Sequence, residues 1–154
     1  MDIEKKLQEA QDLNRYYENV IKQMAAPIIP SIVPKTILVP IAGMIFQDRF
    51  DAIRTKVLEY ADTHKLTETV IFDFTGVGVE DVAVFDYNEL ASEVYQLNAA
   101  LKLMGLRSIY VGFNPRFVQE IVNAGIQIEL EAYVNFRSAL KQMLNEKDKS
   151  LLQF

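Results

Sequence analysis

A short turn holds the residues of this chain whose types and spacing could do chemistry. Thr75 carries the only hydroxyl of this turn, with Asp73 upstream and the glycines Gly76 and Gly78 downstream. The sequence predicts an apolar strand over residues 69–73 and a long helix after the turn. Such strand-to-helix turns are where α/β folds bind ligands, and the first turn of a helix offers free N–H groups and a positive dipole end. This setting suits a phosphate.

Two acidic residues, Glu80 and Asp81, follow the glycines, and with Asp73, Gly76 and Gly78 they form the predicted environment of Thr75 and its partner-binding surface. A phosphate on Thr75 would make this surface strongly acidic. We expect Asp81 to be the N-cap of the following helix, because its carboxylate can accept a hydrogen bond from the first helical turn. The alternative is a tight strand-to-helix connection in which Thr75 only caps the backbone. The residues alone leave both interpretations open.

Several other kinds of site have little support in the sequence. Gly76 and Gly78 begin like a dinucleotide-binding loop, but Asp81 replaces the third glycine, and no Lys-Ser/Thr pair follows. Asp73 and Asp81 could be a catalytic carboxylate pair, but nothing beyond them supplies a base to activate a nucleophile. His64 is the single histidine, and we expect it to be a solvated partner of a helix C-terminus. We therefore expect no catalytic residue, no metal site and no cofactor.

Length, composition and charge narrow the class of protein. The chain has 154 residues, 50% of them hydrophobic, no cysteine and a formal net charge of −5. These values predict one domain with an additional element, and a reducing cytoplasm as its compartment. The negative charge argues against nucleic acid or an anionic membrane as the main partner. No apolar run reaches the roughly 20 residues that span a bilayer, and no signal sequence opens the chain.

Residues 1–26 are predicted to form a linker and dimerisation helix. They contain many helix-forming residues, and neither Gly nor Pro. Apolar positions alternate in steps of four and three residues, which is the heptad spacing of a coiled-coil dimer. We call this set the seam, and it consists of Ile3, Leu7, Ala10, Asn14, Tyr17, Ile21 and Met24. A buried Asn in a seam typically fixes the register of two helices. The alternative is that Leu7, Leu13 and Val20 pack the helix on its own domain.

The remaining chain is predicted to alternate strands and helices. The strands are expected within residues 28–33, 37–42, 69–73, 108–112 and 127–130. The helices are expected at about residues 47–64, 82–104, 115–125 and 135–145. Gly105 is the expected stop of the second of these helices, and Asn114 and Pro115 are the expected N-cap and first residue of the third. This alternation predicts an α/β fold with a mixed, mostly parallel sheet packed with helices. Residues 147–154 are expected to be a solvated tail.

Four segments of the chain resemble one family. They are residues 27–30 (Pro-Ile-Ile-Pro), 37–43 (Ile-Leu-Val-Pro-Ile-Ala-Gly), 70–77 (Val-Ile-Phe-Asp-Phe-Thr-Gly-Val) with Asp81 and Ala83, and 111–115 (Val-Gly-Phe-Asn-Pro). Together they resemble the STAS domain of bacterial anti-sigma-factor antagonists, and more narrowly the RsbR-type co-antagonists of the stressosome. The resemblance covers residues 27–144 and implies a STAS fold over residues 27–146. It also implies a dimer in which the preceding helix is a linker.

The resemblance implies a non-enzymatic signalling protein. RsbR-type proteins assemble with an RsbS-like STAS protein into a particle that holds an RsbT-like serine/threonine switch kinase, which phosphorylates the STAS domains under stress and leaves. Thr75 matches the phosphoacceptor of the family, whereas Val111 and Val82 stand where related proteins carry hydroxyls. Two alternatives remain. One is a STAS scaffold that does not cycle phosphate, and the other is a small-ligand-binding domain or enzyme that uses the loop at residues 76–81.

Overall fold

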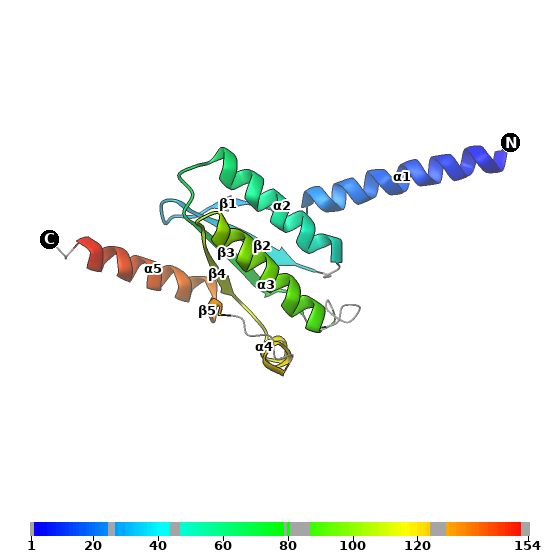
Figure 1. Cartoon of the computed structure of the whole chain (residues 1–154). Coiled ribbons are helices and arrows are strands. Elements are labelled where there is room, and N and C mark those ends of the chain that lie inside the picture. Colours follow the sequence, from blue (N-terminus) through cyan, green and yellow to red (C-terminus); the bar gives the residue numbers. More distant parts are fainter. Residues whose placement is uncertain are drawn as a thin grey trace.

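The protein is built on a five-stranded sheet packed with helices (Figure 1). The computed structural model describes residues 2–24, 27–43, 47–78, 80, 87–123 and 129–151. The strands are β1 (Ile29–Pro30), β2 (Thr36–Ala42), β3 (Thr69–Gly76), β4 (Arg107–Val111) and β5 (Glu131–Tyr133). The helices are α1 (Asp2–Met24), α2 (Gln47–Thr63), α3 (Tyr87–Leu103), α4 (Pro115–Asn123) and α5 (Phe136–Leu151). Strand order follows the sequence, with β1 antiparallel to β2 and all later pairs parallel. The predicted mixed, mostly parallel α/β sheet is confirmed.

Strand β3 is the centre of the sheet and is buried on both faces. Its apolar run places Phe72 against α2 and α3, in the larger of two core clusters. Ile71 points to the opposite face, where it packs with Ala139 and Met143 of α5. Side chains of a strand alternate between the faces, so a continuous apolar run is what a strand covered on both faces requires. Strand β3 runs to Gly76, three residues beyond the predicted end at residue 73. The N–H of Val77 donates to the carbonyl of Phe74 at 2.9 Å, so the chain turns at Thr75 and Gly76, the last two residues of the strand.

The predicted helix ends at both sides of β4 are confirmed. Gly105 has a φ of 76° and terminates α3, as expected for a glycine after the last helical turn. Asn114 caps α4, because its Oδ1 accepts a hydrogen bond of 2.7 Å from the N–H of Phe117. Pro115 is the first residue of α4, where its missing N–H has no cost. These caps set the start of β4 and the direction in which the chain leaves it.

The C-terminal part of the chain differs from the prediction. Strand β5 is Glu131–Tyr133, so residues 129–130 of the strand predicted at 127–130 precede it, and residues 127–128 lie outside the described residues. Helix α5 runs to Leu151 rather than ending near residue 145. A bidentate ion pair between Arg107 and Glu131 joins the start of β4 to β5. Arg107 also binds Glu146 of α5, with a distance of 2.9 Å from Nη1 to Oε2. Both acidic partners hold the pKa of Arg107 above its usual range. The short alternation of apolar and polar residues at 127–130 could not reveal these long-range ion pairs.

Helix α1 extends away from the sheet and its covering helices (Figure 1, blue). All side chains of residues 2–17 are exposed, and these include the seam residues Ile3, Leu7, Ala10, Asn14 and Tyr17. The side chains of Ile21 and Met24 lie outside the described residues. Leu7 and Leu13 are 58% and 51% exposed, so neither packs the helix on its own domain. In the part of the chain that the structure describes, no helix is both long and apolar enough to cross a bilayer.

Candidate functional site

The Thr75 turn lies at the carboxyl ends of the three central strands. Gly76, the last residue of β3, is paired with Ala42 at the end of β2. A Cβ on Gly76 would lie 2.6 Å from the Cβ of Ala42, so a glycine is needed for the strands to approach this closely. The N–H of Gly43 also donates to the carbonyl of Gly76 at 3.2 Å. The backbone that carries Thr75 is therefore held by its neighbour strand.

Asp73 fixes the exposed side chain of Thr75. Its Oδ1 accepts a hydrogen bond of 2.9 Å from the backbone N–H of Thr75 and one of 2.5 Å from the Thr75 hydroxyl. A carboxylate that binds the N–H two residues later forms an Asx turn, which is a local side-chain-to-backbone motif. The sequence-based proposal that Asp73 belongs to the Thr75 environment thus has a geometric basis.

Gly112 is a site residue that the sequence analysis did not assign. It follows β4 with a φ of 78°, and a Cβ on it would lie 2.2 Å from the Oγ1 of Thr75. Residues 75 and 112 are therefore in direct contact although 36 residues separate them. The available signal was the glycine within the segment 111–115, which is the last residue of the strand expected within residues 108–112.

Aromatic rings pack directly behind this contact. Phe74 precedes Thr75, Phe113 follows Gly112, and their ring centroids are 5.0 Å apart. Phe113 also meets Phe117 of α4 edge-on at 4.8 Å. Such ring pairs add about 0.5–1.5 kcal/mol each beyond the area that they bury. They hold the ends of β3 and β4 together and place the N-terminus of α4 beside the turn.

The remaining predicted site residues are placed only in part. Gly78 is half-buried, and a Cβ on it would lie 2.7 Å from the carboxylate of Glu80. Glu80 itself is exposed. Asp81, which we expected to cap the following helix, lies outside the described residues, as does Val82. The structure therefore brings Asp73, Thr75, Gly76 and Gly112 together, with Gly78 and Glu80 further along the same loop.

Val111, the other position where the resemblance implies a hydroxyl, has a side chain that is 0% exposed. It belongs to the smaller core cluster, together with Ile71, Ile109 and Met143. Thr75 and Val111 are close in the sheet, but one faces solvent and the other faces the core. Sequence position alone did not distinguish these two environments.

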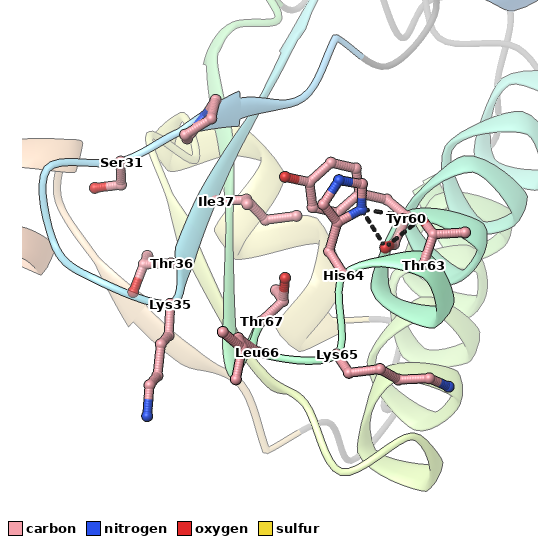
Figure 2. Close-up of a pocket in the computed structure, with 11 residues that line it drawn as sticks. Ser31, Lys35, Thr36, Ile37, Tyr60, Thr63, His64, Lys65, Leu66 and Thr67 are labelled. Carbon is pink, nitrogen blue, oxygen red and sulfur yellow. Dashed lines mark hydrogen bonds between the residues drawn. The ribbon is translucent and has the colours of Figure 1, made fainter.

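A pocket of about 490 Å³ lies at the other end of the sheet from Thr75, where β2 and β3 begin (Figure 2). The rings of Tyr60, in the last turn of α2, and His64, the residue after α2, stack there with centroids 3.8 Å apart. The Nδ1 of exposed His64 is 2.9 Å from the carbonyl of Tyr60, as expected for a partner of a helix C-terminus. None of the described residues of the loop at 76–81, which are 76–78 and 80, lines this pocket. Within the described residues, no three acidic or histidine side chains gather closely enough to hold a metal ion.

Comparison with curated proteins finds relatives that are longer than this chain. No family model matches the chain. The RsbT co-antagonist protein RsbRA of Bacillus subtilis is 31% identical over 70% of this chain and 36% of its own length. RsbRB of the same organism is 30% identical over 88% of this chain and 44% of its own length. A blue-light photoreceptor of Listeria innocua is 27% identical over 79% of this chain and 45% of its own length. The chain spans less than half of the length of each of these relatives.

Comparison with solved structures finds the same fold at low sequence identity. A variant of RsbS from Moorella thermoacetica has a TM-score of 0.62 at 14% identity, over 80% of this chain and 97% of that chain. A chain from a study of the molecular architecture of the stressosome has a TM-score of 0.52 at 14% identity, over 83% of this chain and 100% of that chain. At this identity the similarity concerns the fold alone.

Proposed function

We propose that this chain, which belongs to the RsbR-type STAS-domain proteins, is a non-enzymatic component of a stressosome that binds a switch kinase and is controlled by phosphorylation of Thr75. The observation that carries this proposal is the geometry of Thr75. Its hydroxyl is exposed at the end of the central strand, next to Gly112, which lies two residues before Asn114, the N-cap of α4. A helix N-terminus tolerates a phosphate, because its N–H groups and dipole favour negative charge.

The charge and the size of a phosphate on Thr75 would both act to release a partner docked there. A phosphate adds about −1.5 to −2 charges and three acceptor oxygens. It would lie beside the carboxylate that now accepts the Thr75 hydroxyl, with Glu80 exposed on the same loop. A partner docked on this turn would lose contacts worth about 1–3 kcal/mol each, so two lost contacts would weaken binding by tens- to hundreds-fold or more.

The proposed partners are a second copy of this chain, an RsbS-like STAS protein and an RsbT-like kinase. The exposed seam on α1 supports the homodimer, because apolar side chains at heptad spacing become buried when two helices pair. The names of the relatives support the kinase, since they are described as RsbT co-antagonists. A STAS scaffold that does not cycle phosphate is the competing function. Use of the loop at 76–81 for a small ligand has no support in the pocket of Figure 2, which lies elsewhere.

Kinase treatment followed by intact-mass spectrometry tests the proposal. RsbT of Bacillus subtilis with ATP should add one phosphate per chain, and Thr75→Ala should abolish this addition while still binding the kinase. Thr55→Ala is the matched control, because Thr55 is an exposed threonine of α2. RsbRA, treated in parallel, shows that the kinase is active. No phosphate on this chain, or an undiminished phosphate on Thr75→Ala, would favour the scaffold instead.

A further inference from the structure

We infer that Asp73 and Gly112 are positioning residues for the phosphoryl transfer to Thr75. Asp73 holds the hydroxyl through a hydrogen bond, and Gly112 provides the space in which the hydroxyl lies. The inference rests on the proposed function, because it concerns the acceptor of that reaction. It adds a requirement for two residues that do not themselves receive the phosphate.

The carboxylate of Asp73 stands on a rigid backbone. Asp73 is paired in register with Pro40 of β2 on one side and with Val111 of β4 on the other. One oxygen of this carboxylate accepts both the backbone N–H and the hydroxyl of Thr75. Two hydrogen bonds to one fixed atom select a single side-chain rotamer from the three staggered positions of a threonine. The nucleophilic oxygen therefore has a defined position before any kinase binds.

Gly112 is required on the other side of the hydroxyl. A Cβ at this position would lie 2.2 Å from the Oγ1, 2.6 Å from the N and 2.9 Å from the Cα of Thr75. A carbon atom cannot donate or accept a hydrogen bond in the way that permits such short contacts, so a Cβ at residue 112 would displace Thr75 from its present position. The packing of Phe74 on Phe113 and the bond from the Gly112 N–H to the Val134 carbonyl keep the backbone in place. The hydroxyl thus has room only because residue 112 is glycine.

The transfer itself ends this arrangement. The Oγ1 of Thr75 forms a bond to the γ-phosphorus of ATP, the bond from that phosphorus to the β–γ bridging oxygen breaks, and ADP leaves. The hydroxyl proton passes to a base of the kinase. The product oxygen can no longer donate to Asp73, and the phosphate repels that carboxylate. The phosphorylated Thr75 side chain must therefore leave the position that Asp73 and Gly112 define.

Steady-state kinetics with RsbT of Bacillus subtilis test the role of Asp73. Asp73→Ala should lower kcat by about 10- to 100-fold, the loss expected when a reacting group is misplaced by about 1 Å. The KM for the STAS protein should change little, because the half-buried Asp73 acts through Thr75. Asp73→Asn keeps an oxygen that can accept the hydroxyl and should restore most of the lost rate. A kcat of Asp73→Ala equal to that of the parent would overturn the inference.

Gly112→Ala tests the second residue, with one matched control. Gly105 has a positive φ of 76°, close to that of Gly112, but no atom lies within 4 Å of a Cβ built on it. Gly105→Ala therefore introduces the backbone strain of an alanine with positive φ without a contact to Thr75. Only Gly112→Ala should lower kcat as Asp73→Ala does. The double variant Asp73→Ala with Gly112→Ala should lose no more than either alone, since both act on one hydroxyl. Multiplicative losses would contradict a shared role.

A measurement without kinase separates this inference from the proposed function. NMR couplings across the Thr75 side chain should report one rotamer in the parent and averaging in Asp73→Ala, with faster exchange of the Thr75 amide proton. If this holds but RsbT phosphorylates no chain, the proposed function fails and the positioning stands as a structural fact. If RsbT phosphorylates the parent but the Thr75 rotamer is averaged, the positioning role fails and the proposed function survives.

Discussion

Val111 illustrates at the scale of one residue how burial limits modification. Its position before the N-terminus of α4 is electrostatically suitable for a phosphate, so from the sequence alone Val111→Thr is expected to gain a phosphorylation site. The side chain, however, contacts the α5 face of the core and not solvent. A hydroxyl there would be out of reach of a kinase while the domain is folded.

Val111→Thr should therefore be less stable than the parent and still receive one phosphate per chain. A buried hydroxyl without a partner costs about 1–3 kcal/mol. Denaturant titration measures the free energy of unfolding, and intact-mass spectrometry after treatment with RsbT counts the phosphates. The control is Val118→Thr, because Val118 is an exposed valine of α4 and its replacement should change stability little. A second phosphate appearing as fast as the first would show that β4 opens readily at this end.

Between the helices α2 and α3, Glu93 has a half-buried carboxylate whose positive partner is distant. The side chain of Glu93 is 15% exposed, and its Oε2 has no hydrogen-bond partner among the described residues. The Nη1 of Arg54 is 3.8 Å away from it, while Nη2 of the same residue binds Asp51 at 2.6 Å. Burial raises the pKa of Glu93, the charge of Asp51 raises it further, and Arg54 opposes both.

Glu93→Gln should stabilise the protein at pH 7 and reduce its loss of stability as pH rises from 4. A raised pKa means that the folded state favours the protonated acid, so the stabilisation is complete below the unfolded pKa and is lost as pH rises through the folded pKa. Thermal unfolding across this pH range measures the effect. Glu59→Gln, at an exposed position of α2, should leave the pH profile unchanged. Destabilisation of Glu93→Gln at pH 7 would mean that the bond to Arg54 outweighs the cost of burial.

The exposed seam makes α1 the element that should control assembly. A chain that begins at Pro27 should be monomeric at micromolar concentration, whereas the parent should be a dimer by light scattering, because the seam would otherwise remain in water. Asn14→Leu should keep or raise stability while loosening the choice of oligomer, since the polar residue that fixes register is removed. If the chain without α1 remains fully dimeric, the seam is not the main interface.

At the scale of the whole molecule, stability should depend on β3 and not on the site that β3 carries. Ile71→Ala should cost about 2–5 kcal/mol, because Ile71 is completely buried in the central strand between β2 and β4. Thr75→Ala should cost far less, since its hydroxyl is exposed. Equilibrium unfolding in denaturant measures both free energies. Equal losses would mean that the Thr75 hydroxyl is structural, and the phosphoacceptor proposal would lose its support.

The sequence by itself determined those strand positions and helix ends that depend only on residues close together in the chain. The apolar run before Asp73 predicted a central strand, Gly105 predicted the end of α3, and Asn114 with Pro115 predicted the start of α4. Each prediction depends on preferences that act within one or two turns of chain, such as capping, fixed φ angles and alternation of side chains. The Thr75 turn could be found for the same reason.

The tertiary structure alone decided which distant residues meet. The contact of Gly112 with Thr75, the burial of Val111 and the ion pairs of Arg107 with Glu131 and Glu146 all join different elements. Their positions follow from how strands pair and how helices cover the sheet, and these depend on packing over the whole domain. The place of β5 and the length of α5 follow from the same long-range contacts. The local sequence pattern was therefore enough to locate Thr75 as the proposed phosphoacceptor. Only the folded chain shows that Gly112 encloses its hydroxyl.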